Sequence, residues 1–408
     1  MNLSKINSLF DIINSYGCYN MLVFYAFTDS QLINMCRIKA SFYPHEKSVL
    51  IILKLPRMSS ELINICSDYF DEIMFIEDPY VKYYQSVLVS ELDLIMRKKK
   101  CLSTLFLKLN LYLDESVDRL FLAGFWRLGE YIAYYLSINN PTLSIAFVEE
   151  GIGSYFQSKR NLCFFEYREK KIPKKYFVFL KYQLEGLVIL NQYHHRMLNY
   201  LMDYVDFLYV NNPSACRYND GFRIISITEF DKINNTIQKI SEKYLSSIDI
   251  SEYIERKVIY LVQGNLLGDN TCEIVLNSLV NTFGGDNIIV KEHPEIKSNE
   301  SLIKNIQKLG EQNIYIDNRN ISFELLCSHI CLNDKIIITI NSSGAYLPKF
   351  LEGCEPYVVL LYNLYSDSYA VEISDWLSLI LSSSYNNKQK ISTPKSIVEF
   401  ERDITNIL

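Results

Sequence analysis

Two adjacent carboxylates, Glu149 and Glu150, directly follow the apolar run 143–148. A carboxylate whose pKa is raised by burial or by a neighbouring charge can act as a general base toward a bound hydroxyl group. Gly151 comes next, and because it lacks a Cβ atom it lets the backbone approach a ligand closely. These residues predict a catalytic acidic motif, and an ordinary solvated acidic turn is the alternative.

A second motif, His293-Pro294, follows the β-branched run 287–291. An imidazole at the end of a strand can donate a hydrogen bond to a phosphate oxygen or protonate a leaving group. Pro294 restricts the backbone of His293 toward an extended conformation, and Lys291 would add positive charge. The motif predicts a phosphate-binding or acid-catalytic role, and a loop histidine without function is the alternative.

A third motif, Ser342-Ser343, lies between the apolar run 335–340 and a helix that we predict over 344–351. Hydroxyl groups and backbone N–H groups at the start of a helix favour a bound anion, and the helix dipole adds to the attraction. The motif therefore predicts a phosphate site, with simple capping of the helix as the alternative.

The elements that must position these motifs alternate along the chain, β-rich runs with helical patterns, which indicates parallel sheets covered by helices. We predict strands at 21–27, 48–53, 72–76, 119–123, 143–148, 205–210, 257–262, 287–291, 314–316, 335–340 and 357–361. We predict helices at 31–40, 61–70, 87–111 (one or two), 128–136, 231–245, 271–283, 301–309, 322–327 and 344–351. The fold class is therefore α/β, with largely parallel sheets.

The strands divide into two successive arrays, which predicts two Rossmann-like domains. We expect the first to cover 1–212 and to close with the strand 205–210. Residues 213–256 are expected to form an interdomain connection, and 257–408 the second domain. Ligands bind beyond the carboxyl ends of the strands in open α/β sheets. All three motifs follow a strand, so we expect them to converge on one crevice between the halves.

Composition and missing motifs exclude several classes of protein. The net charge of −6 provides no dominant positive field for a nucleic-acid backbone. The chain has no GxxxxGK[ST] segment, which disfavours a P-loop NTPase, and no DxD triplet to bind a diphosphate through a metal ion. Its ten cysteines include no CxxC and no zinc-like spacing with histidine, so we expect no metal site and mostly buried, reduced thiols.

The sequence also predicts a cytoplasmic location. No signal peptide precedes the first predicted strand, and no run approaches 18 consecutive apolar residues. Two basic groups, Arg97–Lys100 and the lysines at 170, 171, 174 and 175, are expected to be solvated surface. The alternative is peripheral docking to the inner membrane or to an acidic glycan.

Taken together, the three motifs resemble those of the bacterial sialyltransferase and polysialyltransferase families. Those families share a [DE][DE]G motif, a later HP motif and a Ser-Ser or Ser-Thr motif in this order. Residues 29–34 also resemble their TPLQLLN-like segment, and residues 321–326 their PxELL-like segment. The resemblance spans most of the chain, although Ser30 and Ser322 stand where proline is common in the families.

This resemblance implies a GT-B fold, two facing Rossmann-like domains, with acceptor binding in the first and nucleotide-sugar binding in the second. It implies an inverting mechanism that moves sialic acid from CMP-sialic acid to a bacterial surface glycan such as capsule, lipooligosaccharide or O-antigen. Glu150 would be the base, with Glu149 as the fallback, and His293 would assist departure of the CMP phosphate. No cofactor is implied beyond the CMP-sugar donor, and no metal is required.

Several further residues would bind the donor. Ser342 and Ser343 would hold the phosphate, and Glu324 would lie near the cytidine ribose. The remaining candidates for donor contact are Gln263, Gly264, Lys291, Pro294 and Gly151. Two rival functions stay open: a GT-B transferase that uses CMP-Kdo or a UDP-sugar, and a non-catalytic protein that binds glycan or scaffolds glycan assembly.

Overall fold

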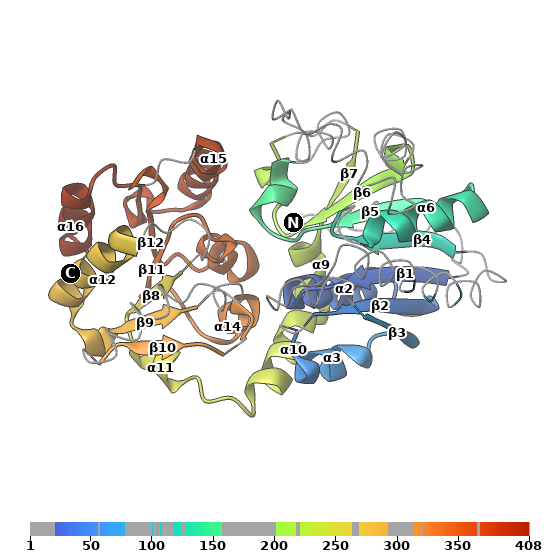
Figure 1. Cartoon of the computed structure of the whole chain (residues 1–408), viewed down its shortest axis with the longest axis horizontal. Coiled ribbons are helices and arrows are strands. Elements are labelled where there is room, and N and C mark those ends of the chain that lie inside the picture. The colour runs from blue at the N-terminus through green and yellow to red at the C-terminus, as the bar shows by residue number, and fades with distance from the viewer. Residues whose placement is uncertain are drawn as a thin grey trace. The chain divides into compact units, whose positions relative to one another are not determined.

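The chain folds into two compact units, each built around one parallel sheet (Figure 1). The computed structural model describes residues 21–55, 58–77, 117–124, 128–156, 201–217, 221–262, 269–292, 313–319, 321–364 and 368–407, with Lys100, Thr104 and Leu107. The first unit comprises Met1–Glu150 and Ser154–Thr236, and the second Gly151–Gly153 and Ile237–Leu408.

The first unit has seven parallel strands in the order β3-β2-β1-β4-β5-β6-β7. They are β1 (Met21–Ala26), β2 (Ser48–Lys54), β3 (Glu72–Glu77), β4 (Val117–Leu122), β5 (Ser144–Val148), β6 (Val205–Val210) and β7 (Arg223–Ser226). The central strands are buried almost throughout, as expected of continuous apolar runs covered on both faces. The chain winds outward from β1 in one direction and from β4 in the other, and ligands favour the strand ends of such a sheet.

The helices of the first unit follow its strands. They are α2 (Asp29–Phe42), α3 (Ser60–Ser67), α6 (Gly129–Asn139) and α9 (Ile227–Asn234), with the 3-10 turns η1 (Ile152–Phe156) and η3 (Pro213–Ala215). The Thr28 hydroxyl caps α2 by accepting a hydrogen bond from the Gln31 backbone N–H at 3.3 Å. α2 packs against α3 and α9 and contacts β1 and β5. Its first half therefore lies beside the residues that follow β5, a strand far from α2 in the sequence.

The second unit has six parallel strands in the order β10-β9-β8-β11-β12-β13. They are β8 (Val258–Leu261), β9 (Ile288–Lys291), β10 (Tyr315–Asp317), β11 (Ile336–Thr339), β12 (Tyr357–Leu360) and β13 (Ile391–Ser392). Its α-helices are α10 (Thr236–Leu245), α11 (Ser251–Glu255), α12 (Asp269–Phe283), α14 (Phe323–His329), α15 (Ser368–Ser384) and α16 (Ile397–Thr405). Short turns complete it: η4 (Gly285–Asn287), η7 (Ser343–Ala345), η8 (Pro348–Glu352), η9 (Tyr362–Leu364) and η10 (Lys388–Lys390).

The predicted strands are all present, and the α/β class with largely parallel sheets is confirmed. Each of the eleven predicted strands agrees with its observed range to within two residues at either end, and β7 and β13 were not predicted. The helix predicted over 301–309 lies outside the described residues. Of the range 87–111, only Lys100, Thr104 and Leu107 are described, and all three are helical.

Three expectations about elements were wrong. The strand 205–210 does not close the first array, because β7 pairs with it as the edge strand. The helix predicted over 231–245 is two helices, α9 and α10, because Asn235 takes the left-handed conformation (φ 52°) and ends α9. The helix predicted over 344–351 is the 3-10 turn η7 followed by the π-helical turn η8. Pro348 has no backbone N–H with which to continue an α-helix.

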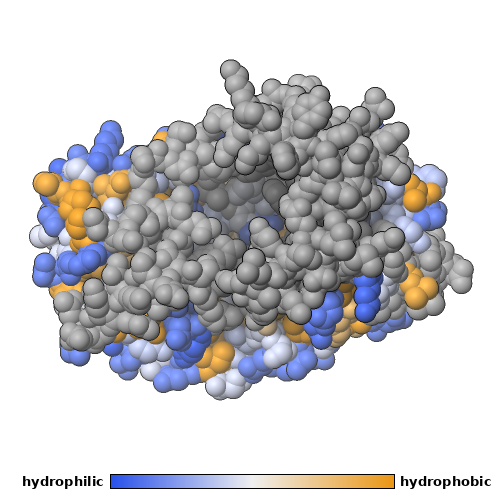
Figure 2. All heavy atoms as spheres, viewed as in Figure 1, coloured by the Kyte–Doolittle hydropathy of each residue, from blue (hydrophilic) through white to orange (hydrophobic). Residues whose placement is uncertain are grey.

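The described surface mixes hydrophilic and hydrophobic residues in small groups on the face shown in Figure 2. The most exposed large apolar side chains, Val398 and Leu107, lie on different elements. Scattered apolar residues of this kind are ordinary on folded proteins and mark no site. Within the described ranges, no helix is long and apolar enough to cross a membrane. Most of the described cysteines are buried, as expected.

The break between α9 and α10 generates a stability prediction. A left-handed backbone costs an ordinary L-residue about 1–2 kcal/mol, whereas asparagine tolerates it better and glycine adopts it freely. We expect Asn235→Ala to lower the free energy of unfolding by about 1 kcal/mol and Asn235→Gly to leave it nearly unchanged. Urea denaturation followed by circular dichroism measures both variants, and equal losses would show that the conformation of Asn235 is not what ends α9.

Candidate functional site

Polar side chains gather at the carboxyl edge of the first sheet. Glu149 and Glu150 directly follow β5, Gln31 and Asn34 lie in the first half of α2 after β1, and Asn211 follows β6. Parallel strands end at the same edge, so the fold brings segments more than 100 residues apart into hydrogen-bonding contact. The acidic motif therefore lies where ligands bind in open α/β sheets.

Glu149 is buried, with 2% of its surface exposed. Its Oε2 atom accepts hydrogen bonds from the Tyr155 hydroxyl and from the backbone N–H of Asn211, both at 2.6 Å. Burial raises the pKa of Glu149, and these hydrogen bonds together with the charge of Arg37 offset part of that rise. The side chain thus holds η1 and the loop after β6 together, and it has little access to a bound substrate.

Glu150 is placed differently, because its side chain is only partly buried. Its Oε1 accepts a hydrogen bond from Nε2 of Gln31 at 2.6 Å. The Gln31 amide is oriented by its other end, since Oε1 of Gln31 accepts from the backbone N–H of Phe27 at 2.9 Å. The Gln31 nitrogen must therefore face Glu150. Of the two adjacent carboxylates, Glu150 is therefore the more exposed.

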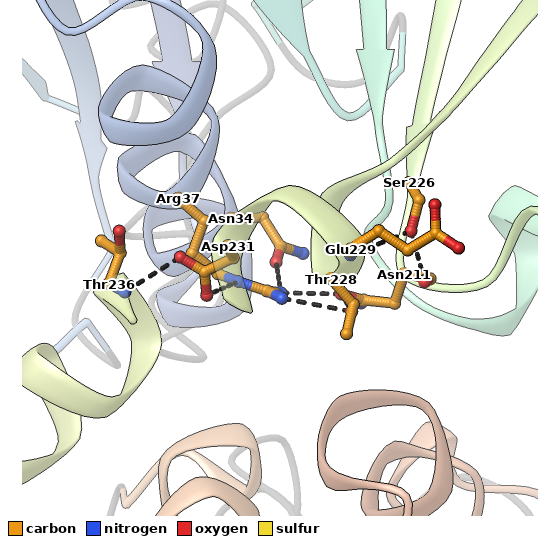
Figure 3. Close-up of polar contacts among 8 residues, drawn as sticks. All are labelled: Asn34, Arg37, Asn211, Ser226, Thr228, Glu229, Asp231 and Thr236. Carbon is orange, nitrogen blue, oxygen red and sulfur yellow. Dashed lines mark hydrogen bonds and ion pairs between the residues drawn. The ribbon is translucent and has the colours of Figure 1, made fainter. Parts of the chain in front are cut away.

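Arg37 in α2 is the centre of a buried polar cluster (Figure 3). Its Nε donates to Oδ2 of Asp231 in α9 at 2.8 Å, and the two side chains are 1% and 2% exposed. Its Nη1 donates to Oδ1 of Asn34 at 3.0 Å and to Oδ1 of Asn211 at 2.7 Å. Its Nη2 donates to the Thr228 hydroxyl at 3.2 Å. This cluster joins the helices after β1 and β7 to the loop after β6.

The serine motif of the second unit follows β11. The Ser342 hydroxyl accepts a hydrogen bond from the Gly344 N–H at 3.2 Å and so caps η7, while Ser343 is the partly exposed first residue of that turn. Because η7 has three residues and the next helical turn, η8, begins only at Pro348, no α-helix begins at the serine pair as predicted. Of the groups predicted to bind phosphate here, the hydroxyl groups of Ser342 and Ser343 are present, but the start of an α-helix is not.

Gly344 has a steric role beside these serines. A Cβ atom added to it would lie 2.5 Å from Cδ1 of Leu261 at the end of β8 and 3.0 Å from Cδ1 of Phe323 in α14. The backbone after Ser343 is therefore packed closely against two neighbouring elements, which fixes the position of the serine pair within the second unit.

Lys291, the last residue of β9, is buried, and its Nζ lies 3.7 Å from Oδ2 of Asp317 at the end of β10. Burial lowers the pKa of Lys291, and the charge of Asp317 offsets part of that effect. Burial alone would raise the pKa of Asp317, but Lys291 and Arg319 outweigh it and hold that pKa below its ordinary value. Glu324, in the first turn of α14, accepts from the Ser322 hydroxyl at 2.6 Å.

Four of the predicted site residues, Gln263, Gly264, His293 and Pro294, lie outside the described residues. β8 ends at Leu261 and β9 at Lys291, so each pair follows a strand whose end is described. Gly151 continues the chain directly after Glu150. Among the described residues, no group of three or more His, Cys, Asp or Glu side chains is arranged to hold a metal ion.

The sequence patterns did not identify the residues that surround the acidic motif. The sequence does not predict the contacts among four of these residues, because their partners are distant in the chain: Arg37, Asp231, Asn211 and Thr228. One signal was available: Arg37 is three residues after Asn34, so the two share one face of a helix whose other residues are mostly buried. A cation on that face requires a buried partner.

No family model matches the chain, and no curated protein matches it. Solved structures do. A UDP-glucosyltransferase from Polygonum tinctorium capable of glucosylating indoxyl is 11% identical, with a TM-score of 0.50, and the match covers 95% of this chain and 89% of that one. A UDP-N-acetylglucosamine 2-epimerase is 12% identical, with a TM-score of 0.46 and 94% of both chains covered.

The GT-B domain of a Photobacterium damselae sialyltransferase is also similar. It is 12% identical, with a TM-score of 0.44, and the match covers 91% of this chain and 99% of that one. Identities this low indicate shared fold alone. The chain has a GT-B-like fold, with two parallel α/β sheets of seven and six strands, as the sequence predicts. It shares this fold with the UDP-glucosyltransferase from Polygonum tinctorium.

The burial of Glu149 generates a pH prediction. An unfolded glutamate has a pKa of about 4.3, and burial raises the folded value. The carboxyl therefore stabilises the fold most when protonated, and this contribution is lost as the pH rises through the folded pKa. Relative to Glu149→Gln, the wild-type protein should lose free energy of unfolding as the pH rises above the unfolded pKa of about 4.3 and until the folded pKa is passed.

Urea unfolding of both proteins across this range measures the difference. A constant offset between the two curves would mean that Glu149 titrates as it does in the unfolded chain. A wild-type protein that gained free energy of unfolding relative to Glu149→Gln as the pH rises would contradict a raised pKa for Glu149.

Proposed function

We propose that the chain is an inverting glycosyltransferase that moves sialic acid from CMP-sialic acid to a hydroxyl group of a bacterial surface glycan. The GT-B-like fold supports the class of enzyme. The acidic, HP and serine motifs, in that order at the ends of strands, support the choice of donor. Glu150 is the general base in this proposal, and Ser342 and Ser343 hold the donor phosphate.

The observation that carries the proposal is the hydrogen bond of 2.6 Å between Gln31 and Glu150. It joins residues 29–34 to the acidic motif, two segments of the resemblance that lie 119 residues apart in the chain. A solvated acidic turn would have no need of a buried glutamine aimed at one of its carboxylates. Gln31 holds Glu150 in one orientation, as a general base needs before an acceptor binds.

The proposed reaction needs one proton transfer and the departure of CMP. Glu150 takes the proton from the acceptor hydroxyl as its oxygen attacks the anomeric carbon of the donor. The bond between that carbon and the phosphate oxygen of CMP breaks, and the electron pair leaves with CMP. Attack on the face opposite the leaving group inverts the anomeric centre. General base catalysis contributes about 10²–10⁴-fold to such a step.

The donor side of the proposal rests on the second unit. The Ser342 and Ser343 hydroxyls donate to the phosphate of the leaving CMP, and Glu324 binds the ribose. His293 assists departure of the phosphate, with Gln263, Gly264, Pro294 and Gly151 contributing to the donor site. Preorganised donors at a developing negative charge are worth about 10²–10³-fold each in other enzymes.

Glu150→Gln tests the proposal. The amide keeps the size of the side chain but cannot accept the proton, so we expect turnover to fall at least about 100-fold. The matched control is Glu46→Gln, a partly buried carboxylate that precedes β2 and so lies at the opposite edge of the same sheet. Release of CMP from CMP-sialic acid, with and without lipooligosaccharide or capsule oligosaccharide acceptors, measures both variants.

The donor panel separates the remaining alternatives. CMP-Kdo and UDP-sugars are assayed beside CMP-sialic acid with the same acceptors. Turnover with one of these donors alone would replace sialic acid in the proposal and keep the transferase. No turnover with any donor and no nucleotide binding by calorimetry would favour the non-catalytic scaffold. A Glu150→Gln variant with wild-type turnover would remove Glu150 as the base.

A further inference from the structure

The peptide bond between Glu149 and Glu150 is held at both of its polar atoms. The Glu149 carbonyl oxygen accepts a hydrogen bond from Nδ2 of Asn34 at 3.1 Å. The Glu150 backbone N–H donates to the Ser154 hydroxyl at 3.0 Å. The plane from which the Glu150 side chain departs is therefore fixed independently of its contact with Gln31.

The orientation of Asn34 is itself set by Arg37. Oδ1 of Asn34 accepts from Nη1 of Arg37 at 3.0 Å, so Nδ2 must face the Glu149 carbonyl. The same Nη1 donates to Oδ1 of Asn211 at 2.7 Å, and the Asn211 backbone N–H donates to Glu149 Oε2 at 2.6 Å. One guanidinium nitrogen thus binds the side chains of two asparagines. The side-chain amide of Asn34 and the backbone N–H of Asn211 then bind different atoms of Glu149.

The position of Arg37 is in turn fixed from α9. Its Nε is paired with Asp231 Oδ2 at 2.8 Å, and the other oxygen of Asp231 accepts from the Thr236 backbone N–H at 3.0 Å (Figure 3). The Thr228 hydroxyl accepts from Arg37 Nη2 and donates to Asn211 Oδ1 at 3.0 Å. Guanidinium groups are planar and rigid, so these partners determine where each N–H group points.

We propose that Arg37 is a positioning residue for Glu150, acting through Asn34 and Asn211 on the peptide that carries the catalytic carboxylate. The Arg37 side chain is only 1% exposed, so it acts from behind the carboxylates and not by binding substrate. The inference rests on the proposed function, because it assigns the network a role in placing the base of that reaction. A network that only stabilised the fold would have no specific effect on turnover.

Arg37→Lys and Asn34→Ala distinguish a role in positioning Glu150 from a role in stabilising the fold alone. Lysine keeps the charge beside Asp231 but cannot reproduce the fork of N–H groups that orients both asparagines. Misplacing a catalytic group by about 1 Å can cost about 100-fold. We expect each variant to lower kcat about 10- to 100-fold while the KM for the donor changes less than about 3-fold.

The matched control is Asn234→Ala. Nδ2 of Asn234 also donates to a backbone carbonyl in the first unit, that of Ala40 at 2.9 Å, but the Asn234 side chain does not contact Arg37 or the acidic motif. We expect its kcat to equal that of the wild-type protein. Wild-type kcat in both Arg37→Lys and Asn34→Ala would overturn the positioning role.

A double-mutant cycle of Asn34→Ala with Gln31→Ala tests whether Asn34 affects kcat through the placement of Glu150. If Asn34 acts by placing Glu150 against Gln31, the loss of kcat in the double variant is smaller than the product of the single losses. If the loss of kcat in the double variant equals the product of the two single losses, Asn34 acts independently of the placement of Glu150, which would contradict the inference.

Hydrogen exchange makes failure of this inference distinguishable from failure of the proposed function. A peptide covering 147–156 should exchange faster in Arg37→Lys and Asn34→Ala than in wild type, because the Glu149–Glu150 peptide group is no longer held at its carbonyl oxygen and the bond from the Glu150 N–H to Ser154 then opens more often. The exchange should be unchanged in Asn234→Ala. If wild type transfers no sugar but this pattern is seen, the proposed reaction fails and the positioning geometry stands. Unchanged exchange in all three variants would overturn the positioning role whatever the reaction.

Discussion

The buried ion pair between Arg37 and Asp231 is the interaction on which the geometry of the first unit depends. Both side chains are almost fully buried, and they join helices whose sequences lie 194 residues apart. Taking two charges out of water is costly, and only good geometry with further hydrogen bonds offsets it. Removing one partner from such a pair typically costs about 3–5 kcal/mol. A fold that needed stability alone would be served as well by apolar residues.

The position of this ion pair relates it to the acidic motif. It lies at the carboxyl edge of the sheet, behind the acidic motif rather than in the middle of the core. Its hydrogen bonds run outward through Asn34 and Asn211 to Glu149, and from Glu149 along the backbone to Glu150. The two carboxylates therefore divide their tasks. Glu149 is buried and holds elements together, while Glu150 is partly exposed and oriented by Gln31.

The sequence predicted eleven strands, because a strand buried on both faces is a short apolar run whose length, β-branched residues and flanking turn residues distinguish it from a buried helix. It failed where one backbone angle decides the outcome. The polar pattern of residues 231–245 is helical on both sides of Asn235, and nothing in it indicates the left-handed conformation that separates α9 from α10. The short strand β7 was also missed as the edge of the first sheet, since its four residues carry little pattern.

The acidic motif and residues 29–34 were identified from the sequence, but their contact was not. Periodicity describes neighbours along the chain, whereas Gln31 and Arg37 bind partners that the fold alone brings near. The difference between Glu149 and Glu150 likewise depends on burial. Two adjacent glutamates look the same in a sequence, and only the loop after β6 and the hydroxyl of Tyr155 distinguish them.

Chemical rescue distinguishes a base at Glu150, supported by Glu149, from the reverse assignment. Glu150→Ala and Glu149→Ala are assayed for sugar transfer in the presence of increasing formate, a small carboxylate that can occupy the space of a missing side chain. We expect formate to restore transfer in Glu150→Ala in proportion to its concentration and to have no effect on Glu149→Ala. Rescue of Glu149→Ala alone would show that Glu149, and not Glu150, supplies the base.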